Sequence, residues 1–457
     1  MNEKELAEKI ASERAGELFA RLYGADGVEA ARQRYAKLAE GMADRDFPAN
    51  EQGANGGGLR VFSAPGRTEL GGNHTDHNSG KVLAASIQLD NVAIVRECAD
   101  ASVFFRSSGH RDVCINLADN SDKPDLQPHA EEQGKTEALV RGIAAELHRR
   151  GTPVNGFSAN ATSSVLTGSG LSSSAAVEVL IGRIFDTLSG DGKRSPLEIA
   201  RIGQIAENDY FGKPCGLMDQ TACAYGGAVA IDFAKLPDGE VWPHVQQIDF
   251  NPAAVGYTLC VVNTAGSHAD LTPDYAAIPS EMKSVAALFG KAVLAELDRD
   301  TVLGAAADVR KKTGDRALLR ALHFFDENDR VDEMAKALKE MDTSGQSGGK
   351  ISAFSRFMDL VNQSGDSSWQ LLQNVYTTQD VKAQGISIAL ALSKNFFRRQ
   401  KLAGACRVHG GGFAGTIQAY VPIDALPSYS ELLEAVFGKN SVTKLRIRPL
   451  GAVELNF

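Results

Sequence analysis

The sequence predicts an α+β fold with mixed or largely antiparallel sheets, built as two lobes. Predicted strands and helices follow one another without the regular alternation that is typical of a parallel sheet. The chain has 457 residues, which is more than one hydrophobic core usually organises. Its hydrophobic fraction of 43% and charged fraction of 23% are those of a globular protein.

The first part of the chain predicts helices, then strands, then helices again. Apolar residues recur at helical spacing through residues 1–45, with a second helical stretch at about 28–42. Residues 50–58, rich in Gly and Asn, indicate a loop. We expect strands at 59–63, 82–88, 92–97, 102–106 and 156–161, with a turn at 89–91. We expect helices at 136–149, from about 172 to 188, and at 199–210.

The second part starts near residue 225 and is richer in helix. We expect strands at 229–233 and 257–262. Helices are expected at about 280–297, 317–325, 330–341, 351–361 and 386–400. We therefore divide the chain into a helical extension (1–45), an N-terminal lobe (46–224) and a C-terminal lobe (225–457).

Charge and cysteine content exclude several classes of function. The net charge of −9 argues against nucleic acid as a partner, because neutralising a phosphate backbone needs a basic face. The six cysteines include no Cys-x-x-Cys pair, which favours reduced thiols. The start of the chain is charged, and no apolar run approaches the length of a membrane span. We expect a cytoplasmic protein without a membrane partner, and a monomer is compatible with the sequence.

A phosphate cradle is predicted at Gly168-Ser-Gly-Leu-Ser-Ser-Ser174, directly before a helix. Glycines let backbone N–H groups approach an anion, and the helix adds its positive end. A serine hydroxyl can also ligate Mg²⁺. No Gly-Lys-Ser/Thr follows, so the segment is not a Walker P-loop. Taken alone, it is as consistent with a linker and a helix N-cap.

A second motif, Ala64-Pro-Gly-Arg-Thr-Glu-Leu-Gly-Gly-Asn-His-Thr-Asp-His-Asn-Ser-Gly80, concentrates charged and polar groups between predicted strands. Carboxylate and imidazole groups can accept and donate to adjacent hydroxyls, while glycines permit close approach. The motif could therefore bind a polyhydroxy ligand. An Asx-rich turn at a strand end is the simpler interpretation of such a motif in isolation.

Two further motifs contribute carboxylates and glycines. Glu207 lies on a predicted helix and Asp219 follows a Gly-containing turn, so one could hold Mg²⁺ and the other could face a nucleophilic hydroxyl. Val408-His-Gly-Gly-Gly-Phe-Ala-Gly415 would permit backbone contact with a ligand. The simpler interpretations are solvated acids and a glycine hairpin.

Taken together, the motifs resemble those of the galactokinases in the GHMP superfamily of small-molecule kinases. The family's sugar signature is matched by Gly66 to Asn78, and Gly-Leu-Ser-Ser-Ser-Ala by Gly170 to Ala175. Its Pro-Cys-Gly-Ile-Met-Asp-Gln is Pro214 to Gln220, and its Gly-Gly-Gly-Phe-Gly-Gly is Gly410 to Gly415 with one Ala. The resemblance covers the chain from about residue 28 onward. It implies the two-lobed GHMP kinase fold, with the active site between the lobes.

The resemblance also implies a reaction and its residues. The reaction is transfer of the ATP γ-phosphoryl group to the anomeric hydroxyl of galactose. Asp219 would accept or orient the sugar hydroxyl proton, with Arg67 beside it offsetting phosphoryl charge. Ser174 and Glu207 would hold Mg²⁺. Backbone groups of Gly168, Ser169, Gly170, Leu171, Ser172, Ser173 and Ser174 would bind ATP. The sugar would contact Asn73, His74, Asp76, Gly216 and Tyr275.

Three departures from the family pattern bear on the substrate. Asn73 replaces the family Glu that contacts the 6-hydroxyl, His77 replaces a Tyr, and Glu69 replaces an Asn. Losing the carboxylate at 73 removes a barrier to a sugar acid such as galacturonate, whereas Asn can also bind a neutral hydroxyl. Galactose is the favoured substrate. A non-catalytic galactose and ATP sensor is a further alternative, but Arg67 and Asp219 are both retained. The sugar motif argues against a kinase for a non-sugar.

Overall fold

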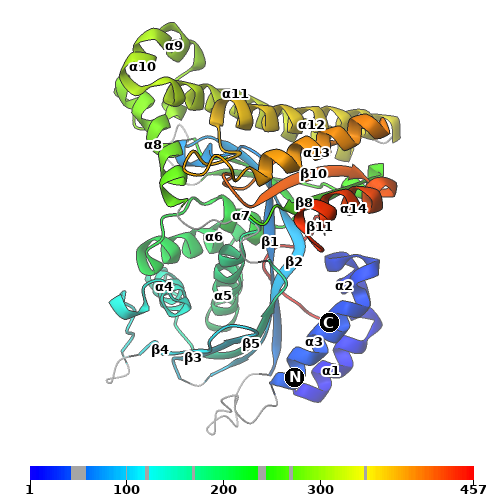
Figure 1. The fold of residues 1–457 in the computed structure, drawn as a ribbon. Helices are drawn as coiled ribbons and strands as arrows, with labels where there is room; N and C mark the ends of the chain where they lie inside the picture. Colours follow the sequence, from blue (N-terminus) through cyan, green and yellow to red (C-terminus); the bar gives the residue numbers. More distant parts are fainter. Residues whose placement is uncertain are drawn as a thin grey trace.

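Two β-sheets organise the chain, and helices cover them (Figure 1). The computed structural model describes residues 1–42, 58–98, 100–118, 123–166, 170–234, 243–266, 271–343 and 347–457. Among these residues the first sheet has the order β12 (Val453–Glu454), β1 (Arg60–Gly71), β2 (Lys81–Glu97), β5 (Phe157–Ser163), β3 (Ser102–Ser107) and β4 (Val113–Asn116). β6 (Ala228–Asp232) pairs with β2, and β7 (His244–Ile248) pairs with β6.

The second sheet has the order β11 (Val442–Leu445), β8 (Tyr257–Asn263), β10 (Thr416–Pro422) and β9 (Ala405–His409). Its pairs are all antiparallel, whereas the first sheet contains the parallel pair β3–β5. Helices combined with mixed sheets confirm the predicted α+β class.

Both faces of the first sheet are covered by helices. Successive residues of its central strands point to opposite faces, and apolar side chains occupy both of them. Val61 and Val92 pack against α1 (Glu3–Ala11), α2 (Glu13–Tyr23) and α3 (Val28–Gly41). Phe62 and Ala93 belong to the core on the opposite face. That face is covered by α4 (Thr136–Arg149), α5 (Ser173–Ser189) and α6 (Pro196–Ile205), next to α7 (Met218–Tyr225) (Figure 1). The helices predicted within residues 1–45 are found as α1, α2 and α3, and the helix predicted at 136–149 is confirmed.

The turn predicted at residues 89–91 is wrong, because β2 runs unbroken through them. Asp90 is fully buried and accepts hydrogen bonds from Tyr23, Ser63, Arg34 and Arg448. Two guanidinium groups therefore neutralise a carboxylate that a local pattern assigns to a turn. These partners hold the pKa of Asp90 below its usual value, although burial alone would raise it.

The segment at 64–80 is only partly a loop, since β1 continues to Gly71. The part that is not strand is residues 72–80, which contain a short 3-10 turn at Asp76–Asn78. Arg67 and Glu69 consequently project from a strand that pairs with β2. A strand holds their side chains more rigidly than a loop would.

Helices cover the second sheet. α13 (Gly385–Gln400) and α14 (Leu426–Phe437) pack on one face, and α12 (Ser347–Ser367) adjoins β9. α11 (Asp315–Thr343) runs beside α12, with α8 (Thr272–Leu288), α9 (Arg299–Gly304) and α10 (Ala306–Thr313) at one end (Figure 1). The helix predicted at 386–400 is confirmed.

The structure corrects the bounds of three helices predicted in this region. The helices expected at 317–325 and 330–341 are the single helix α11. The helix expected at 280–297 is α8, which begins at Thr272 with Pro273 in its first turn and carries Pro279 inside. Proline is tolerated in a first turn because the N–H group there has no helical acceptor. Tertiary packing of Ile278 and Met282 holds the helix together through Pro279.

The lobe boundary at 224/225 stays a prediction. β6 and β7, which follow it, extend the first sheet, and β12 returns to that sheet from the end of the chain. In the part of the chain that the structure describes, no helix combines the length and apolarity needed to cross a bilayer. All six cysteines are free thiols.

Candidate active site

A cavity of about 230 Å³ collects most of the residues that the motifs single out. It lies where β1, the turn after it, the segment before α7 and the glycine turn after β9 meet. Eight residues predicted for the site line it: Arg67, Asn73, His74, Asp76, Ser174, Glu207, Gly216 and Asp219. The motifs, which are separated by up to 337 residues in the sequence, therefore converge on one site.

Arg67 and Asp219 form the central pair of the cavity. Arg67 donates from Nε to Oδ1 of Asp219 over 2.8 Å and from Nη2 to Oδ2 over 2.7 Å. Arg67 also donates to the Gly170 carbonyl, and Ser172 donates its hydroxyl to Oδ2 of Asp219. Burial opposes the charge of Arg67, but the Asp219 carboxylate raises the Arg67 pKa. The pair joins β1, the cradle and α7 in one geometry.

The described part of the predicted cradle has the backbone expected for binding an anion. Gly170 has φ of +72° and Ser172 of +58°, both left-handed, and α5 begins at Ser173. The N-cap residue Ser172 makes no side-chain hydrogen bond to the first turn of α5, whose N–H groups can meet an anion. Leu171 is buried and its carbonyl accepts from Arg67 N over 3.0 Å. The predicted contacts Gly168 and Ser169 lie outside the described residues.

Glu207 and Ser174 provide oxygen donors at one end of the cavity. Glu207 lies in a π-helical turn at Ala206–Phe211, a distortion that often marks functional sites. Its carboxylate is buried, pairs with Lys213 Nζ over 3.0 Å and accepts from Gln220 Nε2 over 3.1 Å. Ser174 is exposed on the first turn of α5. In the described residues no group of three His, Cys, Asp or Glu side chains gathers to hold a metal.

Sequence reasoning missed Glu178, a residue of α5 that shares the donor Gln220 with Glu207. It is fully buried and accepts from Gln220 Nε2 over 2.9 Å, while its Oε1 has no partner. Burial first, and then the charge of Glu207, raise the pKa of Glu178 well above its usual value. The same two effects raise the pKa of Cys215, so it is a poor nucleophile. Gln220, in the motif with Asp219, was the available signal.

The turn after β1 presents His74 and Asp76 to the cavity. His74 has φ of +61°, and its Nε2 lies 2.9 Å from the Gly411 carbonyl. Because a carbonyl only accepts, Nε2 carries the hydrogen and Nδ1 is left as an acceptor. Burial lowers the pKa of His74 to about 4, which keeps the ring neutral. A Cβ on Gly216 would come within 2.4 Å of Asp76 Oδ2, so only glycine fits beside this carboxylate.

Tyr275 is the predicted sugar contact that does not line the cavity. It packs against Gly411, and its hydroxyl donates to the Gly412 carbonyl over 3.1 Å. It supports the glycine turn from behind. Gly410 and Gly411 line the cavity in its place. Glu69 and His77 also line it, although sequence reasoning treated them only as departures from a pattern.

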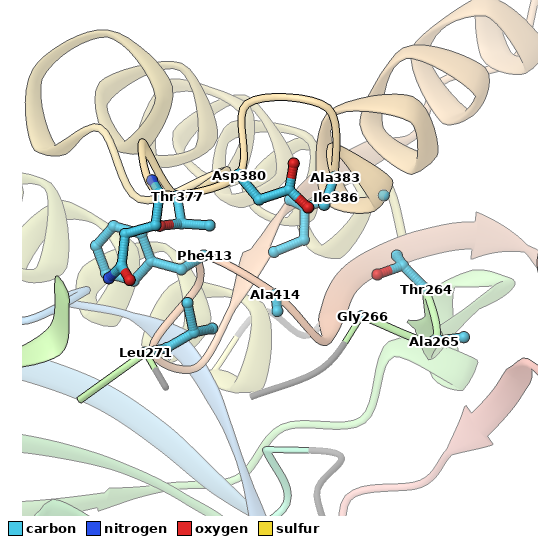
Figure 2. A pocket seen from close by; sticks show the side chains of 12 residues that line it. Thr264, Ala265, Gly266, Leu271, Thr377, Asp380, Ala383, Ile386, Phe413 and Ala414 are labelled. Carbon is cyan, nitrogen blue, oxygen red and sulfur yellow. The ribbon is translucent and has the colours of Figure 1, made fainter. Parts of the chain in front are cut away.

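A second cavity of about 480 Å³ lies beside the same glycine turn, between the end of β8 and the start of α13 (Figure 2). Thr264, Thr377, Asp380, Phe413 and Ala414 are among its lining residues (Figure 2). It contains none of the residues predicted for the site. We assign the candidate site to the smaller cavity because the paired charges converge there.

Comparison with known families gives two matches. The family described as GHMP kinases N terminal domain matches residues 138–227, which include the cradle and Asp219. The family described as galactokinase galactose-binding signature matches residues 50–97, which include Arg67 and His74.

Comparison with curated proteins and solved structures agrees with these family matches. The chain is 31% identical to a galactokinase of Mycobacterium tuberculosis over 370 residues, covering 79% of this chain and 89% of the relative. It is 29% identical to a galactokinase of Glaesserella parasuis, covering 83% and 89%. The crystal structure of Lactococcus lactis galactokinase complexed with galactose superposes with a TM-score of 0.69 at 23% identity, covering 97% of this chain and 99% of that one.

Proposed function

The chain belongs to the galactokinase family of the GHMP kinases, and from this premise we propose that it phosphorylates galactose. The γ-phosphoryl group of ATP passes to the anomeric hydroxyl, giving galactose 1-phosphate and ADP. The observation that carries the proposal is the Arg67–Asp219 pair, which joins the anion-binding turn to the polar sugar turn in one cavity.

Asp219 is the residue that meets the nucleophilic hydroxyl. Arg67 occupies both of its oxygens and Ser172 adds a bond to Oδ2, so Oδ1 has the larger free accepting capacity. The attacking sugar hydroxyl would donate to Oδ1, which orients the hydroxyl and takes its proton as the new P–O bond forms. Arg67 remains positively charged beside the transferring group and offsets its negative charge.

The phosphates would be bound by the backbone of Gly168 to Ser174 and by the first turn of α5. Mg²⁺ fits the oxygen donors Ser174 and Glu207, because this ion usually takes one or two protein ligands together with substrate phosphates. When bound, it would neutralise charge on the β- and γ-phosphates. Glu207 is held in place by Gln220, and Lys213 can swing away because its side chain is 60% exposed.

The sugar would be held by His74, Asp76 and Gly216. Neutral His74 offers Nδ1 as an acceptor, and Asp76 offers a carboxylate next to the Gly216 backbone. Tyr275 would act through the glycine turn that it supports.

The test is ATP-dependent phosphorylation of galactose, N-acetylgalactosamine, galacturonate and glucose by the full chain. We expect turnover of galactose. Asp219→Asn should lower kcat by about 10²- to 10⁴-fold, the usual contribution of a general base, with ATP binding largely retained. A preference for galacturonate would make galacturonate the substrate in place of galactose. Binding of ATP and galactose without turnover would indicate a non-catalytic sensor. Undiminished turnover by Asp219→Asn would reject the assigned base.

A further inference from the structure

Asn73 has no hydrogen-bonding capacity left for a substrate. Its Nδ2 donates to Glu69 Oε1 over 3.1 Å and to the Gly410 carbonyl over 2.8 Å. Its Oδ1 accepts from Asn374 Nδ2 over 2.7 Å and from Ser368 Oγ over 3.4 Å. A side-chain amide has two donor hydrogens and two lone pairs, and all four are used. Asn73 therefore shapes the cavity wall without offering a bond to a ligand.

Glu69 is the neighbour with capacity to spare. Its side chain is only 4% exposed, and it lines the cavity. Oε1 takes both available bonds, from Asn73 and from Arg407 Nη2 over 2.6 Å. Within the described part of the chain, Oε2 accepts no hydrogen bond. A buried carboxylate with one fixed and one unoccupied oxygen is preorganised to accept from a donor in the cavity.

The position of Glu69 relative to the reacting groups follows from the strand. Arg67 and Glu69 are two residues apart on β1, so both side chains point to the same face. Two residues along a strand span about 6.6 Å. The Arg67 side chain binds Asp219 on α7, whereas the Glu69 side chain is held by Arg407 on β9. Glu69 thus faces a different part of a bound sugar from the part that faces Asp219.

We propose that Glu69, rather than Asn73, accepts a hydrogen bond from a hydroxyl of the sugar distant from the reacting one, and that it selects neutral sugars. This inference rests on the proposed function and names one of its specificity-determining residues. Arg407 and Asn73 are positioning residues that fix Oε1. An anionic substituent in the same place meets the Glu69 carboxylate and is repelled. A neutral hydroxyl instead makes a charge-assisted hydrogen bond.

The test compares galactose with 2-, 3-, 4- and 6-deoxygalactose by kcat/KM. The unaltered protein should discriminate against one deoxy sugar by about tenfold or more, the usual cost of a lost bond to a charged group. Glu69→Ala should lose this discrimination for that sugar only, and its kcat/KM for galacturonate relative to galactose should rise. Glu69→Asp keeps the charge next to Arg407 but withdraws the oxygen, so it should fold normally and lose the same discrimination.

Glu281→Gln is the matched control, because Glu281 pairs with the buried Arg320 outside the cavity, Oε2 to Nη1 2.9 Å. It should leave every sugar ratio unchanged. A uniform fall for all sugars in both Glu69 variants, with discrimination intact, would assign Glu69 a structural role and overturn the proposal. Failure of the unaltered protein to phosphorylate galactose would instead reject the proposed function.

Discussion

Arg67 holds the carboxylate of Asp219 with two parallel hydrogen bonds, 2.8 and 2.7 Å long, across 152 residues of sequence. Each residue comes from a rigid element, Arg67 from β1 and Asp219 from the first turn of α7. The carboxylate therefore cannot rotate freely, and its orientation depends on the planar fork of arginine.

Arg67→Lys should lower kcat strongly although it conserves the charge. A lysine offers a point charge and cannot make two parallel bonds, so Asp219 loses its orientation. We expect a loss of about 10- to 100-fold in kcat, with a smaller change in the KM for galactose. Arg60→Lys is the matched control, because Arg60 binds Glu454 with two 2.6 Å bonds on the same strand outside the cavity. Equal effects of the two substitutions would contradict the prediction.

Glu207→Gln should raise the concentration of Mg²⁺ needed for half-maximal activity. An amide is a weaker ligand than a carboxylate for a hard cation. At saturating ATP we expect a shift of about tenfold or more in the Mg²⁺ dependence of kcat. Glu132→Gln, which alters a carboxylate paired with Arg141 at 2.7 Å outside the cavity, should not move this dependence. An unchanged Mg²⁺ curve for Glu207→Gln would remove Glu207 from the metal site.

Gly72→Ala should destabilise the protein. Gly72 has φ of +90°, and an added Cβ would lie 2.5 Å from the Lys81 carbonyl oxygen. Its N–H also donates to the buried Glu327 over 3.0 Å. We expect a loss of about 3 kcal/mol or more in the free energy of unfolding, from strain plus clash.

The control for this substitution is Gly109→Ala. Gly109 has φ of +81°, but nothing lies within 4 Å of its added Cβ. Only the backbone strain remains there, about 1–2 kcal/mol. Urea unfolding of both variants distinguishes the cost of the backbone strain from the cost of the steric clash. If Gly109→Ala cost as much as Gly72→Ala, the close packing of the turn after β1 would not matter.

The buried histidines should destabilise the folded protein as the pH decreases below about 6.5, whereas Glu178, whose pKa is raised by burial, acts in the opposite direction. Burial lowers the pKa of His74 to about 4, and it also lowers those of His323 and His409. Below the ordinary histidine pKa of about 6.5, these side chains bind protons in the unfolded chain but remain neutral in the folded chain. The stabilisation is therefore complete above pH 6.5 and is lost on acidification.

A histidine that is protonated in the unfolded chain and neutral in the folded chain contributes a slope of at most about 1.4 kcal/mol per pH unit. Urea unfolding between pH 7 and pH 5 measures the slope. His323→Gln should reduce it, since His323 is fully buried between Ser367 and the Asn73 carbonyl. An identical slope in the variant would show that His323 is not among the groups responsible. Glu327, whose pKa is lowered to about 2 by His323 and Arg330 against the effect of burial, titrates below this range.

Much of the fold and the site could be predicted because their signals are local. The helix at 136–149 follows from its periodicity, and the site residues lie in dense motifs whose residue types already indicate anion and sugar binding. The unbroken strand β2 could not be predicted. Asp90 resembles a turn residue, and only Arg34 and Arg448, remote in sequence, make its burial favourable.

Glu69 and Tyr275 show the same limit within the site. Glu69 in a strand resembles a surface residue. The residues around it do not predict its ion pair with Arg407, which is 338 positions away in the sequence. The position of Tyr275 in its motif predicts a sugar contact, but whether the side chain faces the cavity or the back of the glycine turn depends on how α8 begins. That start is at Thr272, ahead of two prolines that sequence patterns treat as helix breakers.

The buried carboxylate of Asp90 also constrains the order of assembly during synthesis. Its partners come from α3, from β1 and from Arg448, and β12 pairs with β1 while Leu455 and Phe457 pack with α1 to α3. Domains commonly fold on the ribosome as soon as they emerge. Here the first sheet stays incomplete, with an under-neutralised internal charge, until residues 448–457 have left the exit tunnel. A chain truncated before Arg448 should thus be a client of chaperones and proteases rather than a smaller stable lobe.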